Sequence, residues 1–216
     1  MGEPLKAVVF DMDGVLFEGH NFWLELHVRY GGDIDDARRL IDRYLESDYA
    51  MLAEQIAGRR WRGNPAEPYL ELVAERRYQP GVHETLAFLR ESEIATMIVS
   101  SGPDLLAERA ERELGIDAIR ANGLEIRDGR ITGATTIRVA DAEKATVAFD
   151  VMRELGVTVG ATAAVGDSES DVALAEQVAL PIAYDSTSER LTSVATYALA
   201  HGELPRLCEI VRSVSG

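Results

Sequence analysis

Short, continuous apolar runs recur along this chain, and segments with helical periodicity separate them. The runs are residues 7–10, 95–99, 162–165, 180–183 and 197–199, with a shorter one near Ile119. Runs of this kind are typical of strands that are buried on both faces, as in a parallel sheet. Helical spacing of apolar residues is found between them, in segments 82–91, 105–114, 142–155 and 171–176. This alternation predicts an α/β fold with a doubly wound, mainly parallel sheet.

Two segments depart from the alternation. From residue 17 to 78 the apolar residues recur at helical spacing only, and Gly58 and other glycines separate the pieces. We therefore expect a helical cap domain at 17–78, inserted after the first strand of a core domain made of 1–16 and 79–216. Segment 125–133 carries Asp-Gly between two strand-like stretches, which predicts a β-hairpin.

The composition narrows the choice of partners. Of the 216 residues 46% are hydrophobic, which is ample for a core, and no apolar run reaches the roughly 18 residues of a membrane span. The net charge of −15 argues against nucleic acid, because phosphate backbones are bound by surplus lysine and arginine. We expect no signal peptide before the first strand, and the single cysteine, Cys208, excludes an internal disulfide. We expect a cytoplasmic protein, a monomer or a homodimer, that binds neither nucleic acid nor membranes.

Two aspartates follow the first predicted strand directly. Because strand residues alternate between faces, Asp11 and Asp13 would share one side of an extended backbone, and Gly14 then lets the chain turn. Carboxylates at the carboxyl end of a buried strand lie where α/β sheets place their ligands. A divalent cation such as Mg²⁺ would offset their mutual repulsion. For this motif taken alone, an ordinary acidic turn is the alternative.

Two further polar clusters end strands of the predicted sheet. Ser100, Ser101 and Gly102 follow one strand, and Asp167 and Asp171 follow another. Taken singly, a serine-rich turn and a capped acidic loop are ordinary features. The carboxyl ends of parallel strands share one edge, however, so these clusters and the first aspartate pair should converge. Their convergence predicts a single ligand site.

The ordered motifs resemble those of haloacid dehalogenase-type phosphohydrolases. The motifs are Asp11-Met12-Asp13-Gly14-Val15, Ser100 at a strand end, Lys144, and Gly166-Asp167 with Asp171. The resemblance covers essentially the whole chain and is greatest to the phosphoserine phosphatase group, to which the helical insertion, the segment 121–124 and the hairpin also point. It implies Mg²⁺-dependent hydrolysis of a phosphate monoester through an aspartyl-phosphate.

The resemblance also implies catalytic roles. Asp11 would be the nucleophile, and Asp13 would be the general acid for the leaving alkoxide and then the base for water. Lys144, one of only two lysines in the chain, would offset negative charge in the transition state. A compact ammonium suits a crowded anionic site better than a planar guanidinium does.

Ligands for phosphate and metal follow from the same resemblance. The phosphoryl oxygens would be held by Ser100 and by the main-chain N–H groups of Ser101 and Gly102. The Mg²⁺ site would be formed by Asp11, the main-chain carbonyl of Asp13, and Asp167. Asp171 would complete the site by supporting these metal ligands or by holding Lys144.

The substrate is expected to be a small phosphorylated metabolite, with phosphoserine as the first candidate. Its ammonium would need an acidic partner near Glu18 and His20, and its carboxylate an arginine among Arg59, Arg60 and Arg62. The alternatives are a phosphatase or phosphotransferase for a sugar or polyol phosphate. In a different class, the fold would serve as a non-catalytic module that binds a phosphorylated ligand.

Overall fold

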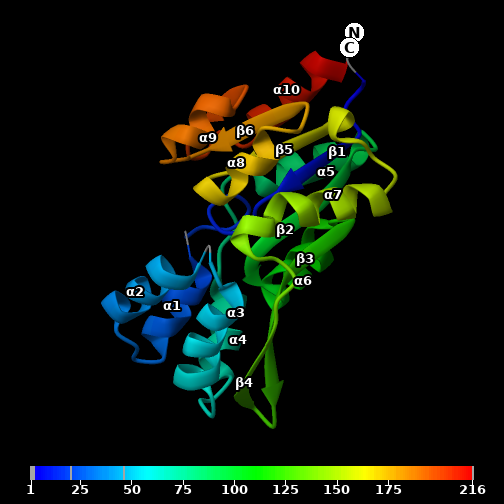
Figure 1. The fold of residues 1–216 in the computed structure, drawn as a ribbon. Coiled ribbons are helices and arrows are strands. Elements are labelled where there is room, and N and C mark those ends of the chain that lie inside the picture. Colours follow the sequence, from blue (N-terminus) through cyan, green and yellow to red (C-terminus); the bar gives the residue numbers. More distant parts are fainter. Residues whose placement is uncertain (1–2, 20, 46, 216) are drawn as a thin grey trace.

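A mainly parallel sheet forms the centre of the molecule (Figure 1). The computed structural model describes residues 3–19, 21–45 and 47–215, and within them the strand order is β4-β3-β2-β1-β5-β6-β7. Neighbouring strands are parallel except for the antiparallel pair β3 and β4. The strands are β1 (Ala7–Phe10), β2 (Ala95–Pro103), β3 (Ala118–Arg127), β4 (Arg130–Thr136), β5 (Thr162–Gly166), β6 (Leu180–Tyr184) and β7 (Tyr197–Leu199). The sheet extends from β1 in both directions, which confirms the predicted doubly wound α/β fold.

Helices cover both faces of this sheet. Those on one face are α5 (Val82–Glu91), α6 (Asp104–Leu114) and α10 (Arg206–Ser215). Those on the other face are α7 (Lys144–Glu154) and α8 (Val172–Ala175), and α9 (Glu189–Val194) packs against α8. Short 3₁₀ turns are η2 (Asp141–Glu143), η3 (Val159–Ala161) and η4 (Glu169–Asp171).

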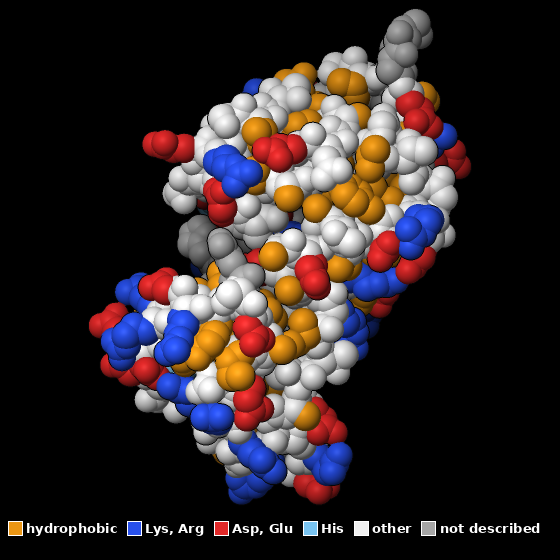
Figure 2. Space-filling model, in the orientation of Figure 1, with side chains coloured by type: hydrophobic (Ala, Val, Ile, Leu, Met, Phe, Trp, Pro, Cys, Tyr) orange, Lys and Arg blue, Asp and Glu red, His pale blue; other side chains and the backbone are white. Residues whose placement is uncertain are grey.

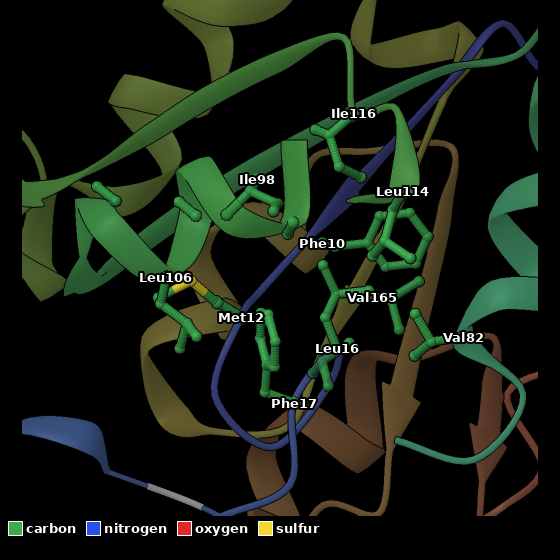
Figure 3. Close-up of a cluster of buried hydrophobic side chains, with 14 of the residues drawn as sticks. Phe10, Met12, Leu16, Phe17, Val82, Ile98, Leu106, Leu114, Ile116 and Val165 are labelled. Carbon is green, nitrogen blue, oxygen red and sulfur yellow. The ribbon is translucent and has the colours of Figure 1, made fainter. Parts of the chain in front are cut away.

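The alternation of side chains along β1 explains the two layers. Val8 and Phe10 point to one face and join the larger cluster of buried side chains, part of which is drawn in Figure 3. Ala7 and Val9 point to the other face and pack against α7. All four are buried, as expected for a strand whose apolar run has no polar interruption.

The segment between β1 and α5 forms a group of helices beside the core (Figure 1, dark blue to cyan). Its elements are α1 (Phe22–Arg29), α2 (Ile34–Tyr44), α3 (Tyr49–Ala53), the π-helix η1 (Glu54–Trp61) and α4 (Glu67–Glu75). Each of the first three helices is capped at its N-terminus by a side chain that accepts a hydrogen bond from a backbone N–H of the first turn. The capping residues are Asn21, Asp33 and Asp48. Gly58, which we expected to separate two helices, instead lies inside η1.

The β3–β4 hairpin extends from the sheet along these helices. The Gly63 N–H donates to the Ile131 carbonyl at 2.8 Å, and the Ile131 N–H donates to the Asn64 carbonyl at 2.9 Å. A Cβ on Gly133, where φ is +88°, would lie 3.1 Å from the Cα of Gly58. The two glycines therefore let the hairpin and η1 approach closely.

Two linkers join the helical group to the core. They run side by side, with the Glu18 N–H donating to the Arg77 carbonyl and the Gln79 N–H donating to the Leu16 carbonyl, both at 2.9 Å. The rings of Phe17 and Tyr78 stack between the linkers with their centroids 4.5 Å apart. These contacts place the crossing points next to the first aspartate motif.

Charged side chains of both signs are spread over the face shown in Figure 2. Basic side chains gather on the outer surface of the helical group and of the hairpin in that view. Among the residues that the structure describes, no helix is both long enough and apolar enough to cross a membrane.

Candidate active site

The loop after β1 brings the first aspartate motif next to the motif that contains Asp167. The N–H of Asp11 donates to the Val165 carbonyl at 2.9 Å, and the side chain of Asp11 is buried. Gly14 has a φ of +81°, and a Cβ at this position would collide with the carboxylate of Asp167. Position 14 therefore requires glycine both for its backbone conformation and for its close approach to Asp167.

Asp13 connects the same loop to α1, the first helix of the helical group. Its Oδ2 accepts the N–H of Phe22, the first residue of α1, at 2.9 Å. Its Oδ1 is buried without a hydrogen-bond partner among the described residues. Burial raises the pKa of Asp13 to about 6. A carboxyl group with such a pKa and an oxygen that accepts no internal hydrogen bond is suited to proton transfer.

Lys144 is the basic group of the site. It is the first residue of α7, its side chain is 3% exposed, and its Nζ lies 2.8 Å from Asp11 Oδ1 and 2.7 Å from Asp171 Oδ1. Burial alone would lower the pKa of Lys144, but the two carboxylates outweigh burial and raise that pKa above its usual value. The ammonium group is therefore charged at neutral pH and fixed beside Asp11.

Asp171 organises the loop after β5. While Oδ1 faces the lysine, Oδ2 accepts the N–H of Asp167 at 3.1 Å and the N–H of Ser168 at 3.2 Å. The Ser168 hydroxyl also donates to Oδ2, and the two residues form a capping box at the start of η4. Both oxygens of Asp171 are thus engaged in shaping the loop and in positioning Lys144.

The end of β2 supplies hydroxyl and amide groups. Ser100 is buried, and its Oγ accepts the N–H of Gly102 at 3.2 Å. A Cβ on Gly102 would lie 3.4 Å from Ser100 Oγ and 3.7 Å from Asp13 Oδ2. The backbone at Gly102 is therefore within reach of a group bound at the aspartate pair. Ser100, Ser101 and Gly102 all line the same cavity as Asp11 and Asp13.

The acidic residues fit a divalent cation. One carboxylate oxygen from each of Asp11, Asp167 and Asp171 lies within 4.8 Å of the others. Burial, and then repulsion from Asp11, raise the pKa of Asp167 to about 8. A hard cation prefers this all-oxygen donor set and would offset the repulsion. Asp13, whose Oδ1 has no hydrogen-bond partner among the described residues, lines the same cavity.

The cavity above these residues has a volume of about 260 Å³ and extends between the core and the helical group. The helical group contributes Trp23, Tyr49 and Trp61 to its lining, and none of these was predicted from the sequence to be a site residue. The Ser101 carbonyl accepts the Trp23 indole N–H at 2.8 Å and the Tyr49 hydroxyl at 3.2 Å. Asn122 donates to the same carbonyl at 3.0 Å. This carbonyl thus ties the helical group to the strands at the edge of the site.

The charged cap residues considered for phosphoserine do not line this cavity. Glu18 pairs with Arg77 at 2.7 Å, Arg60 pairs with Asp36, and Arg59 lies 3.8 Å from Glu54. Arg62 is exposed. His20 lies outside the described residues.

The fold and the converging carboxylates define an α/β core with an acidic site at the carboxyl edge of its sheet and a helical insertion after its first strand. The family model for haloacid dehalogenase-like hydrolases matches residues 8–176. The chain belongs to this family, which confirms the resemblance found in the sequence.

Relatives that the chain is similar to are named phosphoserine phosphatases. One from Archaeoglobus fulgidus is 28% identical over 96% of this chain, and SerB2 from Mycobacterium tuberculosis is 28% identical over 91% of it. The chain spans only 60% and 48% of the length of these two proteins. A solved phospho-aspartyl intermediate analogue of phosphoserine phosphatase aligns with a TM-score of 0.80 at 21% identity, covering 98% of this chain and 100% of the other. The structural likeness supports the fold.

Proposed function

We propose that this protein is a phosphomonoesterase that uses Asp11 as its nucleophile and acts on a small phosphorylated metabolite. The observation that carries the proposal is the pairing of Asp11 with Lys144 at 2.8 Å, beside Asp13 with its partnerless oxygen. A buried carboxylate held by an ammonium group, next to a carboxyl group with a raised pKa, provides a nucleophile and a proton carrier in one cavity. The family supports hydrolysis as the reaction type.

In the first step, an oxygen of Asp11 attacks the phosphorus of the substrate and the bond to the leaving alcohol breaks. The protonated form of Asp13 gives its proton to the departing alkoxide. In the second step, the Asp13 carboxylate takes a proton from water, and that water attacks the phosphorus of the aspartyl-phosphate. Inorganic phosphate leaves, Asp11 is restored, and Asp13 is again protonated. A pKa of about 6 suits Asp13 to both steps.

Other residues would bind and orient the phosphoryl group. Ser100 would donate its hydroxyl hydrogen to a phosphoryl oxygen, and Gly102 would turn its N–H from the serine to the ligand. Lys144 would place its charge beside Asp11 where negative charge builds up.

The proposed cation is Mg²⁺, held by Asp11, the main-chain carbonyl of Asp13 and Asp167. When bound, it would neutralise charge on the phosphoryl oxygens. Asp171 supports this arrangement by holding the loop and the lysine, because both of its oxygens are already engaged.

We further propose that residues 17–78 act as a cap on a core formed by 1–16 and 79–216. The paired linkers at Phe17 and Tyr78 and the anchoring of Trp23 on Ser101 support this division. Such a cap excludes water while Asp11 is phosphorylated.

The single cysteine, which excludes an internal disulfide, supports the cytoplasm as the location.

The test is phosphate release from para-nitrophenyl phosphate. We expect turnover with Mg²⁺, loss of turnover on exhaustive chelation, and recovery when Mg²⁺ is restored. A non-catalytic module that only binds phosphorylated ligands would release no phosphate under any of these conditions. Turnover that chelation leaves unchanged would contradict the metal assignment.

A further inference from the structure

The part of the cavity that faces away from the aspartates is apolar. Its cap side is lined by Trp23, Leu45, Leu52, Ala53, Ile56 and Trp61. Several of these side chains are almost fully enclosed, with exposed fractions of 6% for Leu52 and 3% for Trp61. The leaving group of a phosphate ester held at Asp11 would enter this part of the cavity, because it is continuous with the phosphoryl end.

The described residues that line the cavity do not supply the positive charge that the carboxylate of an amino acid would require. Among the described residues that line it, Lys144 is the only lysine or arginine, and its ammonium already faces Asp11 and Asp171. His27 lines the cavity too, but its Nδ1 accepts the indole N–H of Trp61 at 3.2 Å, and burial lowers its pKa. An imidazole in this position is neutral at pH 7.

The negative charge at the rim works against a carboxylate as well. Asp141 lines the cavity beside Tyr49, whose pKa is raised to about 12 by burial and then by the Asp141 charge. The carboxylate of phosphoserine would enter an apolar space with Asp141 near it, and no described residue that lines this space offers a free cation to pair with. A desolvated carboxylate without a partner is strongly disfavoured.

We propose that the natural leaving group is an uncharged, predominantly apolar alcohol, so that the substrate is its alkyl or arylalkyl phosphate. This inference rests on the proposed phosphatase function and specifies its substrate class. The phosphate is held by the polar end of the cavity, and the apolar body of the alcohol packs against the tryptophans and aliphatic side chains of the cap. The burial of that body provides the discrimination.

The test compares kcat/KM for four esters of primary alcohols: 2-phenylethyl phosphate, ethyl phosphate, phosphoethanolamine and phosphoserine. All four leaving groups are alkoxides, so differences in rate report mainly on the contacts of the alcohol. Burial of the phenyl ring should favour 2-phenylethyl phosphate over each of the others by at least about tenfold.

A matched pair of variants on α3 locates the effect. Ala53 lines the cavity, whereas Ala50 on the same helix is exposed and lies outside it. Ala53→Leu should lower kcat/KM for 2-phenylethyl phosphate about tenfold more than it lowers that for ethyl phosphate, because the added side chain occupies the apolar space. Ala50→Leu should leave both values at the wild-type level.

Faster hydrolysis of phosphoserine or phosphoethanolamine than of 2-phenylethyl phosphate would overturn the inference and leave the phosphatase standing. If Ala53→Leu lowered kcat/KM equally for 2-phenylethyl phosphate and ethyl phosphate, the inference would be overturned as well. If none of the four esters and no para-nitrophenyl phosphate were hydrolysed, the proposed function itself would fail, and the inference with it.

Discussion

Lys144 is the residue on which the geometry of the polar cluster depends. Its ammonium group lies between two buried carboxylates, Asp11 and Asp171, at 2.8 and 2.7 Å. Removing one member of a buried ionic cluster is costly, because the remaining charges stay buried without a partner. The chain offers a natural comparison in Lys6, whose side chain is 55% exposed and which pairs with Glu3.

Replacement of Lys144 by alanine should lower the free energy of unfolding by about 3–5 kcal/mol. Lys6→Ala should lower it by less than about 1 kcal/mol, because an exposed ion pair contributes little. Urea unfolding with a chelator present, so that no bound cation compensates, measures both. Equal effects of the two substitutions would show that the buried cluster does not contribute as described.

Asp11→Asn should reduce kcat for para-nitrophenyl phosphate by about a thousandfold or more, because an amide oxygen cannot form the acyl-phosphate. The protein should remain folded, since the amide occupies the same volume. Asp128→Asn, at the exposed tip of the hairpin, is the matched control and should retain the wild-type rate. A folded Asp11→Asn variant with wild-type turnover would rule out this nucleophile.

For individual residues, the sequence predicted the position of a site side chain where the sheet places that side chain. Asp11 and Asp167 directly follow β1 and β5, and Ser100 lies near the carboxyl end of β2. Parallel strands bring such residues to one edge, so their convergence in one cavity was predictable. That Trp23 and Tyr49 also line the cavity was not predictable from the sequence. Helical periodicity identifies an apolar face, but it does not say which members of that face turn toward a neighbouring domain.

Among the elements, the paired linkers determine how the cap is attached. Arg109 of α6 donates from Nη1 to the carbonyls of Val73 at 2.9 Å and Arg76 at 2.7 Å, where α4 ends. Its guanidinium also lies over the rings of Phe17 and Tyr78. One core side chain thus holds the end of the last cap helix and both linkers.

Arg109→Ala should therefore destabilise the protein by about 1–3 kcal/mol, because partly buried carbonyls lose a charged donor. It should also speed limited proteolysis within the linkers. Arg112→Ala on the same helix is the control, since that side chain is 69% exposed. Unchanged cleavage of the linkers in Arg109→Ala would contradict the role given to this arginine.

The extents of several elements differ from those predicted. The apolar run predicted a strand at 95–99, but β2 continues through the polar residues Ser100 and Ser101 to Pro103. The pairing of Pro103 with Asn122 on β3 extends it. Gly58 does not end a helix but lies inside η1, where the absence of a side chain lets the hairpin approach at Gly133. In these cases tertiary contacts, which a local pattern does not contain, override the local preference.

For the whole molecule, the net charge of −15 is a source of repulsion. Raising the ionic strength from about 0.01 M to about 0.15 M shortens the screening length from about 30 Å to about 8 Å. We expect the melting temperature to rise, by about 2–4 °C for each kcal/mol of repulsion relieved. Scanning calorimetry at the two salt concentrations measures this, and a fall in melting temperature would show that attractive surface ion pairs dominate instead.

The central claim is that a phosphoryl group is transferred to Asp11. The most direct measurement is an acid quench during turnover of para-nitrophenyl phosphate with Mg²⁺, followed by peptide mass analysis. The account predicts one phosphoryl group on the peptide that contains Asp11, and none on that peptide from Asp11→Asn. Rapid turnover without a phosphorylated peptide, or with the phosphoryl group on a different residue, would contradict it.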